Sequence, residues 1–105
     1  MAHVEKKTIK WDMPTVPDVI KHQVFIAKVG DTLDMSSVMA EVMMPAVSVT
    51  CPDDFPEGTF NDDTVSYQIG IVAFDDQGNY SDMEVLTPYP FDFIPPPVPT
   101  GGVVI

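Results

Sequence analysis

The stretch from Val65 to Asp82 limits what this chain can fold into more than any other part of it. In positions 65–73 apolar residues occupy every odd position, whereas Ser66, Gln68 and Gly70 fall on even positions. Because successive side chains of a strand point to opposite faces, this alternation predicts a strand with one buried face. Residues 75–79 follow with the sequence DDQGN, in which glycine and asparagine can take the positive φ of a turn. The segment therefore predicts a half-buried strand that ends in a tight turn.

Five other segments are predicted as strands, because each is apolar or alternating and ends at turn residues. They are Lys6–Met13, Lys21–Val29, Val38–Met44, Ala46–Cys51 and Met83–Thr87. Met, Ala and Glu in the third segment favour a helix, but no helix fits between the flanking elements of so small a domain. A chain of 105 residues is long enough for one domain with a two-layer core, and too short for two cores.

One motif relates the chain to a known family. The pattern Y-x-I-x-I-x-A-x-D-x-x-G-N-x-S, which begins at Tyr67, resembles the penultimate strand and last hairpin of a fibronectin type III-like domain, within the immunoglobulin-like β-sandwich superfamily. Trp11, on a strand that a proline closes, matches the tryptophan that these domains place at the centre of the core. Phe55–Thr59 is similar to the corner before their long strand, and Tyr67 matches their corner tyrosine, whose hydroxyl bonds backbone nearby. The resemblance implies an all-β, fibronectin type III-like antiparallel β-sandwich of about seven strands.

The alternation and the resemblance together predict the hydrophobic core. Its members are Trp11, Val24, Ile26, Val49, Tyr67, Ile69 and Ile71. His22 stands where the family usually has a tyrosine. Phe25 lies opposite Val24 in parity, so either this strand is covered on both faces or Phe25 marks a contact surface. Residues 1–88 are predicted to form the sandwich, and residues 89–105 a proline-rich connector followed by a C-terminal strand.

The net charge of −11 is unevenly distributed and limits the choice of partners. All five lysines lie within residues 1–28, whereas residues 29–105 hold thirteen acids and no base, and the chain has no arginine. Nucleic acids and anionic membranes are poor partners for such a chain, because their binding rests on Lys and Arg that neutralise phosphates. No apolar run of about 18 residues occurs, so no membrane span is predicted.

The first eleven residues contain no apolar stretch of signal-peptide length. We therefore expect cytoplasmic synthesis without a visible signal peptide, unless a signal has been removed. Cys51 is the single cysteine, so no internal disulfide is predicted, and its apolar surroundings indicate a small buried side chain.

Catalysis is not expected from this sequence. The two histidines are His3 and His22, and nothing in the sequence brings Cys51 near either, so no nucleophile–base pair is predicted. The paired acids lie in turns that should be solvated, and exposed carboxylates lack the raised pKa that general acid catalysis needs. The sequence also has no Cys/His set for zinc and no glycine-rich phosphate loop.

Calcium is the metal ion that the acidic loops would suit best, because this ion takes oxygen ligands. The candidates in the last hairpin are Asp75, Asp76, Asn79 and Asp82. A second group, in the crossover before the long strand, consists of Asp53, Asp54, Asp62 and Asp63. Neither group has the spacing of an EF-hand loop, so we expect acids that form and solvate turns, and no cofactor.

The C-terminal tail carries the pattern that fibronectin type III-like domains show at their start. These domains open with an edge strand about ten or more residues before the tryptophan, often with Pro-x-x-Pro-Thr-Gly and then alternating valines. Here Trp11 is preceded by no such strand, and the pattern occurs at Pro97–Ile105 instead. We therefore predict that Gly102–Ile105 pairs as a first strand, either on its own domain or on the next subunit. A third reading is that the tail begins the following domain of a tandem array.

The function that these features favour is a non-enzymatic assembly module, such as a virion accessory protein or an extracellular filament subunit. Its partners would be copies of itself or other assembly subunits. The predicted interaction residues are Val98, Val103, Val104, Ile105, Phe91 and Phe93. The alternative is a carbohydrate- or protein-binding module of a larger extracellular enzyme or adhesin. Exposed aromatics on one face would favour that alternative, and the candidates are Phe60, Tyr80, Tyr89, Phe91 and Phe93.

Overall fold

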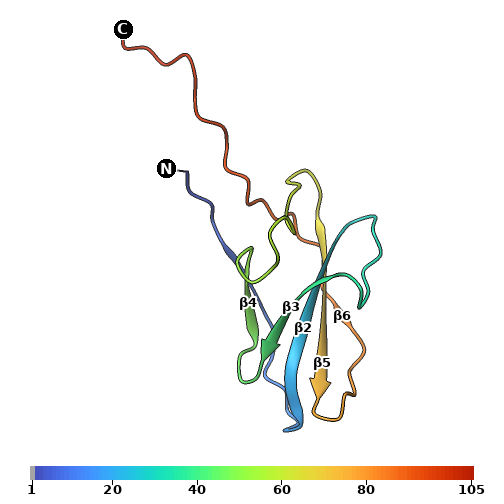
Figure 1. The fold of residues 1–105 in the computed structure, drawn as a ribbon. Helices are drawn as coiled ribbons and strands as arrows, with labels where there is room; N and C mark the ends of the chain where they lie inside the picture. Colours follow the sequence, from blue (N-terminus) through green and yellow to red (C-terminus); the bar gives the residue numbers. More distant parts are fainter. Residues whose placement is uncertain (1) are drawn as a thin grey trace.

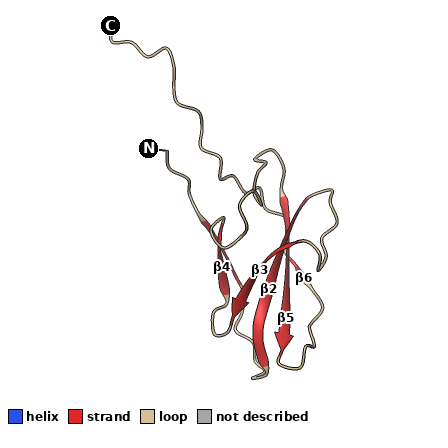
Figure 2. Cartoon of the chain, in the orientation of Figure 1, coloured by secondary structure: helices blue, strands red, loops and turns tan. Residues whose placement is uncertain are grey.

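The computed structural model describes residues 2–105, which form six β-strands and no helix (Figures 1 and 2). The strands are β1 (Lys7–Lys10), β2 (Val19–Lys28), β3 (Val38–Met43), β4 (Ser48–Cys51), β5 (Tyr67–Asp75) and β6 (Glu84–Val85). Strands β1 and β4 make a two-stranded antiparallel sheet, and the other four make an antiparallel sheet in the order β3-β2-β5-β6. The prediction of an all-β fold is confirmed, with six strands in place of about seven.

Strand β3 shows how tertiary contacts override local helix propensity. Its six residues pair in register with β2, so the helix-favouring methionines and glutamate lie in an extended chain. Ala40 and Val42 point into the core, whereas Met39, Glu41 and Met43 on the other parity remain exposed. The predicted strand at this position is therefore confirmed.

The core lies between the two sheets and draws apolar side chains from both. Ile9, Val49 and Cys51 come from the two-stranded sheet, and they pack with side chains of β2, β3 and β5. Six of the residues predicted for the core belong to this buried cluster: Val24, Ile26, Val49, Tyr67, Ile69 and Ile71. Trp11 differs, because it is only partly buried and packs against the margin of the cluster. Its strand ends at Lys10, so Trp11 lies just beyond the paired region.

Tyr67 ties the crossover between β4 and β5 to the core. The Tyr67 hydroxyl accepts a hydrogen bond from the Asp62 N–H at 3.0 Å and donates to the Asp62 carbonyl oxygen at 3.1 Å. Its ring is 1% exposed and packs edge-on against Phe60, with ring centroids 5.2 Å apart. The expected bond from this hydroxyl to nearby backbone is therefore confirmed.

The outer face of the four-stranded sheet is also partly covered. Phe25 and Val72 are both buried, although they lie outside the main core cluster. Gly70 pairs with Phe25, and a Cβ at Gly70 would overlap the side chain of Met83 and press on Leu33. The missing side chain therefore leaves room for Met83 to lie over the sheet. Of the two readings of Phe25, the structure supports a strand covered on both faces.

The chain remains in contact with the domain beyond residue 88. Tyr89 pairs with Tyr67 through two backbone hydrogen bonds of 2.8 and 3.0 Å, and Phe91 is 3% exposed within the core cluster. Phe93 packs against the same cluster. Prolines at 88 and 90 interrupt the strand ladder without preventing this burial. Of the two aromatic residues predicted for interaction, Phe91 is therefore buried within its own domain, and Phe93 is half-buried.

The tail after Phe93 projects away from the domain (Figure 1). The molecule measures 68 × 29 × 21 Å, and its radius of gyration is 17.2 Å. A compact domain of this length would have a radius of gyration of about 13 Å. Val98, Val103, Val104 and Ile105 are all at least 80% exposed. Residues 102–105 form no strand in the described chain, so the tail does not fold back onto its own domain.

Candidate docking groove

The two-stranded sheet has one closed edge and one open edge. At the outer edge of β4, the Thr50 N–H donates to Asp54 Oδ2 at 2.7 Å, and the Thr50 carbonyl accepts from the Asp54 N–H at 2.9 Å. This turn satisfies the backbone of the strand on the side away from β1. Within residues 2–105, β4 is the one strand that pairs with β1, so the far edge of β1 is open.

The register shows which backbone groups line the open edge. The Trp11 N–H donates to the Val47 carbonyl at 3.1 Å, and hydrogen-bonded pairs of an antiparallel ladder recur at every second residue. Ile9 therefore also bonds to β4, whereas the N–H and C=O groups of Thr8 and Lys10 point away from it. Thr8 lies opposite Thr50, whose backbone groups bond to Asp54 on the side away from β1. Thr8 and Thr50 therefore do not bond to each other, which agrees with this assignment. The open edge thus presents the backbone of Thr8 and Lys10.

A groove of about 340 Å³ runs beside this edge, between β1 and the segment that contains β6. It is lined by Lys7, Thr8, Ile9, Lys10, Ile69, Leu86, Thr87, Tyr89 and Phe91. Ile9, Ile69 and Phe91 belong to the core cluster, and Leu86 packs against it. Core side chains therefore form the floor of the groove, which lies beside the unpaired backbone groups of Thr8 and Lys10.

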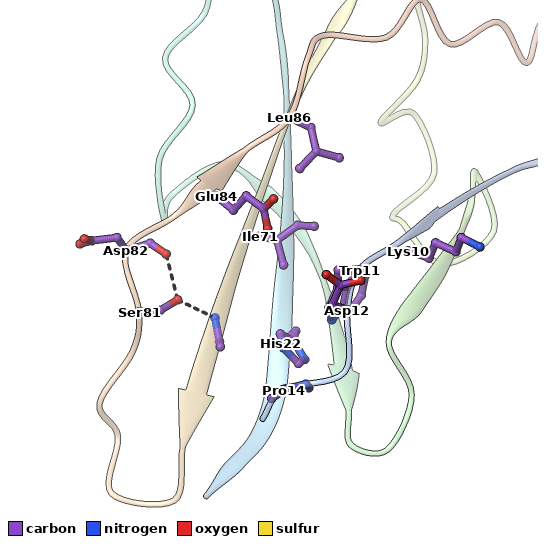
Figure 3. A pocket seen from close by; sticks show the side chains of 11 residues that line it. Lys10, Trp11, Asp12, Pro14, His22, Ile71, Ser81, Asp82, Glu84 and Leu86 are labelled. Carbon is purple, nitrogen blue, oxygen red and sulfur yellow. Dashed lines mark hydrogen bonds between the residues drawn. The ribbon is translucent and has the colours of Figure 1, made fainter. Parts of the chain in front are cut away.

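A second cavity, of about 440 Å³, continues the groove toward the end of β1 (Figure 3). The two share Lys10 and Leu86 in their walls. The remaining lining residues are Trp11, Asp12, Pro14, His22, Ile71, Ala73, Ser81, Asp82 and Glu84. In Figure 3 the β1 side contributes Trp11 and Asp12, and the β6 side contributes Glu84 and Leu86. We call the groove and this cavity together the β1–β6 cleft.

Trp11 and His22 lie next to each other in the wall of the cavity. Their ring centroids are 5.2 Å apart, and the rings are tilted by 56°. Trp11 Nε1 and His22 Nδ1 are both buried, and neither has a hydrogen-bond partner among the described residues. Burial lowers the pKa of His22 from its ordinary value of 6.5, so the ring is neutral at pH 7. Both nitrogens are shielded from solvent, so a ligand that enters this cavity meets the rings of Trp11 and of a neutral His22.

The sequence pattern indicated that His22 is buried, although His22 was not among the residues predicted for the core. His22 has the parity of Val24 and Ile26, so the alternation that buries these two side chains also directs His22 inward. Its polarity argued against the core, and the structure resolves the conflict by placing it, 4% exposed, at the wall of the cavity.

The cavity lacks the hydrogen bond between nucleophile and base that acyl-transfer catalysis uses. Ser81 Oγ accepts from the Ala73 N–H at 3.0 Å and donates to the Asp82 carbonyl at 2.9 Å, so backbone groups engage it. His22 Nδ1 contacts no hydroxyl in residues 2–105. Cys51 is buried in the core, where desolvation and the neighbouring Asp54 raise its pKa to about 12. Within residues 2–105, neither Ser81 nor Cys51 is therefore hydrogen-bonded to His22.

Two of the four calcium candidates of the last hairpin, Asp75 and Asn79, stabilise the turn. Asp75 Oδ1 accepts from the N–H groups of Gln77 and Asn79 at 2.9 and 2.8 Å, and Oδ2 accepts from Asn79 Nδ2 at 3.0 Å. These bonds, that of the Asn79 side chain first, lower the pKa of Asp75. Asp76 and Asp82 do not join this network. Within residues 2–105, no three or more His, Cys, Asp or Glu side chains gather in a way that would hold a metal ion.

The acids of the crossover are separated in the same way. Asp53 forms an exposed ion pair with Lys6 at 2.6 Å, and Asp54 binds the backbone of β4. Asp62 accepts from the Thr64 N–H at 2.9 Å, and Asp63 is exposed. Each carboxylate that bonds therefore supports a different local turn or strand.

The aromatic candidates for ligand binding divide between core and surface. Phe60 and Phe91 are buried with ring centroids 5.0 Å apart, and Phe93 packs on Phe60 at 5.2 Å. Tyr80 and Tyr89 are exposed, at 62% and 40%. The five rings therefore do not form one exposed face, because three of them hold the crossover and the base of the tail together.

Comparison with known protein families, characterised proteins and solved structures finds no match to this chain. The cleft must therefore be interpreted from its own geometry. Among residues 2–105 there is no helix long and apolar enough to cross a membrane.

Proposed function

We propose that this protein is a structural subunit with a fibronectin type III-like fold, which assembles head to tail by donating its C-terminal strand. The observation that carries the proposal is the open edge of β1 beside an apolar groove, in a chain whose own apolar tail is exposed. The setting that we propose for such a subunit is a virion or an extracellular filament.

The strand count supports this proposal. The resemblance implies about seven strands, of which the first is an edge strand that precedes the strand with the tryptophan. Here six strands are present in residues 2–105, and Trp11 directly follows β1. The free position beside β1 is thus the position of the first strand. The tail repeats the sequence pattern with which such a strand begins, at Pro97–Ile105.

The physical driving force has two parts. An unpaired strand edge recruits other strands, because its backbone N–H and C=O groups can bond in register. Val98, Val103, Val104 and Ile105 lie in water, and full burial of one such side chain contributes about 1.5–3 kcal/mol. The prolines at 95, 96, 97 and 99 keep the approach extended, so less conformational entropy is lost on docking.

The orientation of the tail favours another copy over its own domain. In Figure 1 both termini lie at one end, and the tail leaves this end pointing away from β1. To reach its own open edge it would have to reverse direction within a proline-rich segment, which favours extended chain. A contact of this kind between copies does not close on itself, so repetition produces a filament.

Removal of residues 98–105 tests the proposal. The parent chain should form oligomers whose mass increases with concentration in sedimentation or light scattering, and the shortened chain should remain monomeric. A matched control replaces Val103, Val104 and Ile105 with serine, which keeps the length of the tail and removes its apolar side chains. Equal assembly of the parent and both variants would refute strand donation, and a parent that is monomeric at all concentrations would refute it as well.

The alternative of a carbohydrate- or protein-binding module rests on Tyr80 and Tyr89, which are the exposed members of the predicted aromatic set. They belong to different parts of the chain: the Tyr80 ring is tilted against that of Phe74, and Tyr89 pairs with Tyr67. This alternative therefore has less structural support than assembly.

A further inference from the structure

We infer that the Trp11–His22 cavity is a binding site for a proline-containing segment. In the assembly it would bind Pro97-Val98-Pro99 of the preceding copy. Residues 103–105 of the same tail then lie beside Thr8 and Lys10 in the groove. This inference rests on the proposed strand donation and adds to it the direction of the donated chain, its register and a recognition site.

The direction follows from the course of the chain. β1 runs away from the end of the molecule that carries both termini, and β6 runs toward that end (Figure 1). A copy stacked on this end in the same orientation meets the tail at its opposite end, where β1 finishes. The tail therefore enters the cleft at Trp11 and runs antiparallel to β1, toward Lys7. The proline segment thus reaches the cavity, and the terminal valines and isoleucine reach the groove.

The lengths of the tail and the cleft agree. Residues 98–105 are eight residues, which extend over about 26 Å at 3.3 Å per residue. On the β1 side the cleft is lined from Lys7 to Pro14, which is also a stretch of eight residues. With Ile105 opposite Lys7 in an antiparallel register, Gly101 lies opposite Trp11 and Val98 lies opposite Pro14. The proline segment therefore occupies the Pro14 end of the cavity. Residues 94–97 remain to connect the two domains.

The chemistry of the cavity matches a proline segment. Trp11 Nε1 can only donate a hydrogen bond, and it is buried without an acceptor in the described chain. Pro97 and Pro99 bring carbonyl acceptors and no N–H groups, and extended proline segments dock on aromatic-lined grooves in this way. Leu86 and Ile71 supply apolar contacts for the pyrrolidine rings.

The charges of the cavity fit an uncharged occupant. Asp12, Asp82 and Glu84 line it together with Lys10. The tail from Ile94 to Ile105 carries no charged side chain, so these groups can stay hydrated at the rim while the segment docks. A basic side chain from an unrelated partner would meet the same acids, and the experiment below separates that occupant from the tail.

The test uses the full chain as acceptor, with Val103→Asp and Ile105→Asp to disable its own tail. The probe is a synthetic peptide of residues 95–105. Trp11 is the single tryptophan, so its emission reports directly on the cavity. We expect saturable peptide binding with a shift of Trp11 emission to shorter wavelength, because the peptide excludes water from the ring.

Three variants assign the contacts. A peptide with Pro97→Ala and Pro99→Ala should bind about 2- to 5-fold more weakly for each proline lost. A peptide with Val103→Asp and Ile105→Asp should not bind. An acceptor that also carries Trp11→Phe keeps a ring and loses the donor, and labelled-peptide anisotropy should show binding weakened by about 3- to 10-fold. Its circular dichroism and melting temperature, compared with those of the acceptor, verify that the fold is retained.

The outcomes distinguish the proline-binding cavity from strand donation. One outcome is that the peptide binds, Trp11 emission does not shift, and neither the proline substitutions nor Trp11→Phe weakens binding. In that case strand donation stands and the proline-binding site is refuted. If the peptide does not bind at all, both are refuted. If a lysine-containing peptide of unrelated sequence binds the cavity and the tail peptide does not, the cavity serves a different partner.

Discussion

Phe91→Ala tests whether the residue beyond the last strand belongs to the core. Phe91 is 3% exposed, and its ring lies 5.0 Å from Phe60 and 4.7 Å from Tyr89 between centroids. Truncation of a buried phenylalanine to alanine costs about 3–5 kcal/mol, because apolar contacts are lost and a cavity remains. The total stability of a domain is about 5–15 kcal/mol, so the variant should lose a large part of it.

The measurement is urea unfolding followed by far-UV circular dichroism, with Tyr80→Ala as the matched control. Tyr80 is 62% exposed and touches one ring, that of Phe74 at 5.5 Å, so its removal should cost about 0.5–1.5 kcal/mol. The tail-shortened chain serves as the background, which keeps assembly out of the comparison. A Phe91→Ala variant no less stable than the Tyr80→Ala variant would show that the segment after Pro88 is not part of the core.

Three further predictions concern single side chains. Tyr67→Phe should lower the free energy of unfolding by about 1–3 kcal/mol, because the N–H and C=O groups of Asp62 both lose their partner. An unchanged urea midpoint would contradict this prediction. His22 has a lowered pKa when folded, so the unfolded chain binds its proton first, and stability should fall as pH drops below about 6.5. His22→Gln should flatten that part of the stability profile against pH. Cys51, with its pKa raised to about 12, should react with iodoacetamide only after unfolding, which mass spectrometry can follow.

The positions of the strands could be predicted from the sequence because alternation is a local property. Tyr67, Ile69 and Ile71 repeat every second residue, and a strand turns them all to one face regardless of what covers it. The bonding of the Tyr67 hydroxyl to nearby backbone was expected from the family resemblance, and the structure identifies the partner as Asp62, five residues away. The sign of the charge and the lack of arginine are likewise properties of the chain and need no fold.

The burial of side chains outside the alternating segments was decided by the tertiary structure. Phe91 lies among prolines, where no period marks a buried face, and it becomes part of the core because Tyr89 pairs with Tyr67 and turns it inward. Trp11 was predicted at the centre of the core, yet β1 ends one residue earlier, so its ring lies at the margin beside His22.

The β1–β6 cleft also depends on contacts between distant residues. The apolar, proline-rich and extended character of the tail can be predicted from its composition alone. That β1 has an open edge follows only from the sheet order, and that the edge adjoins an apolar groove follows from the position of β6 and Leu86. Periodicity determines which face of a strand is buried, but the neighbours of a strand are determined by long-range pairing, which no local pattern specifies.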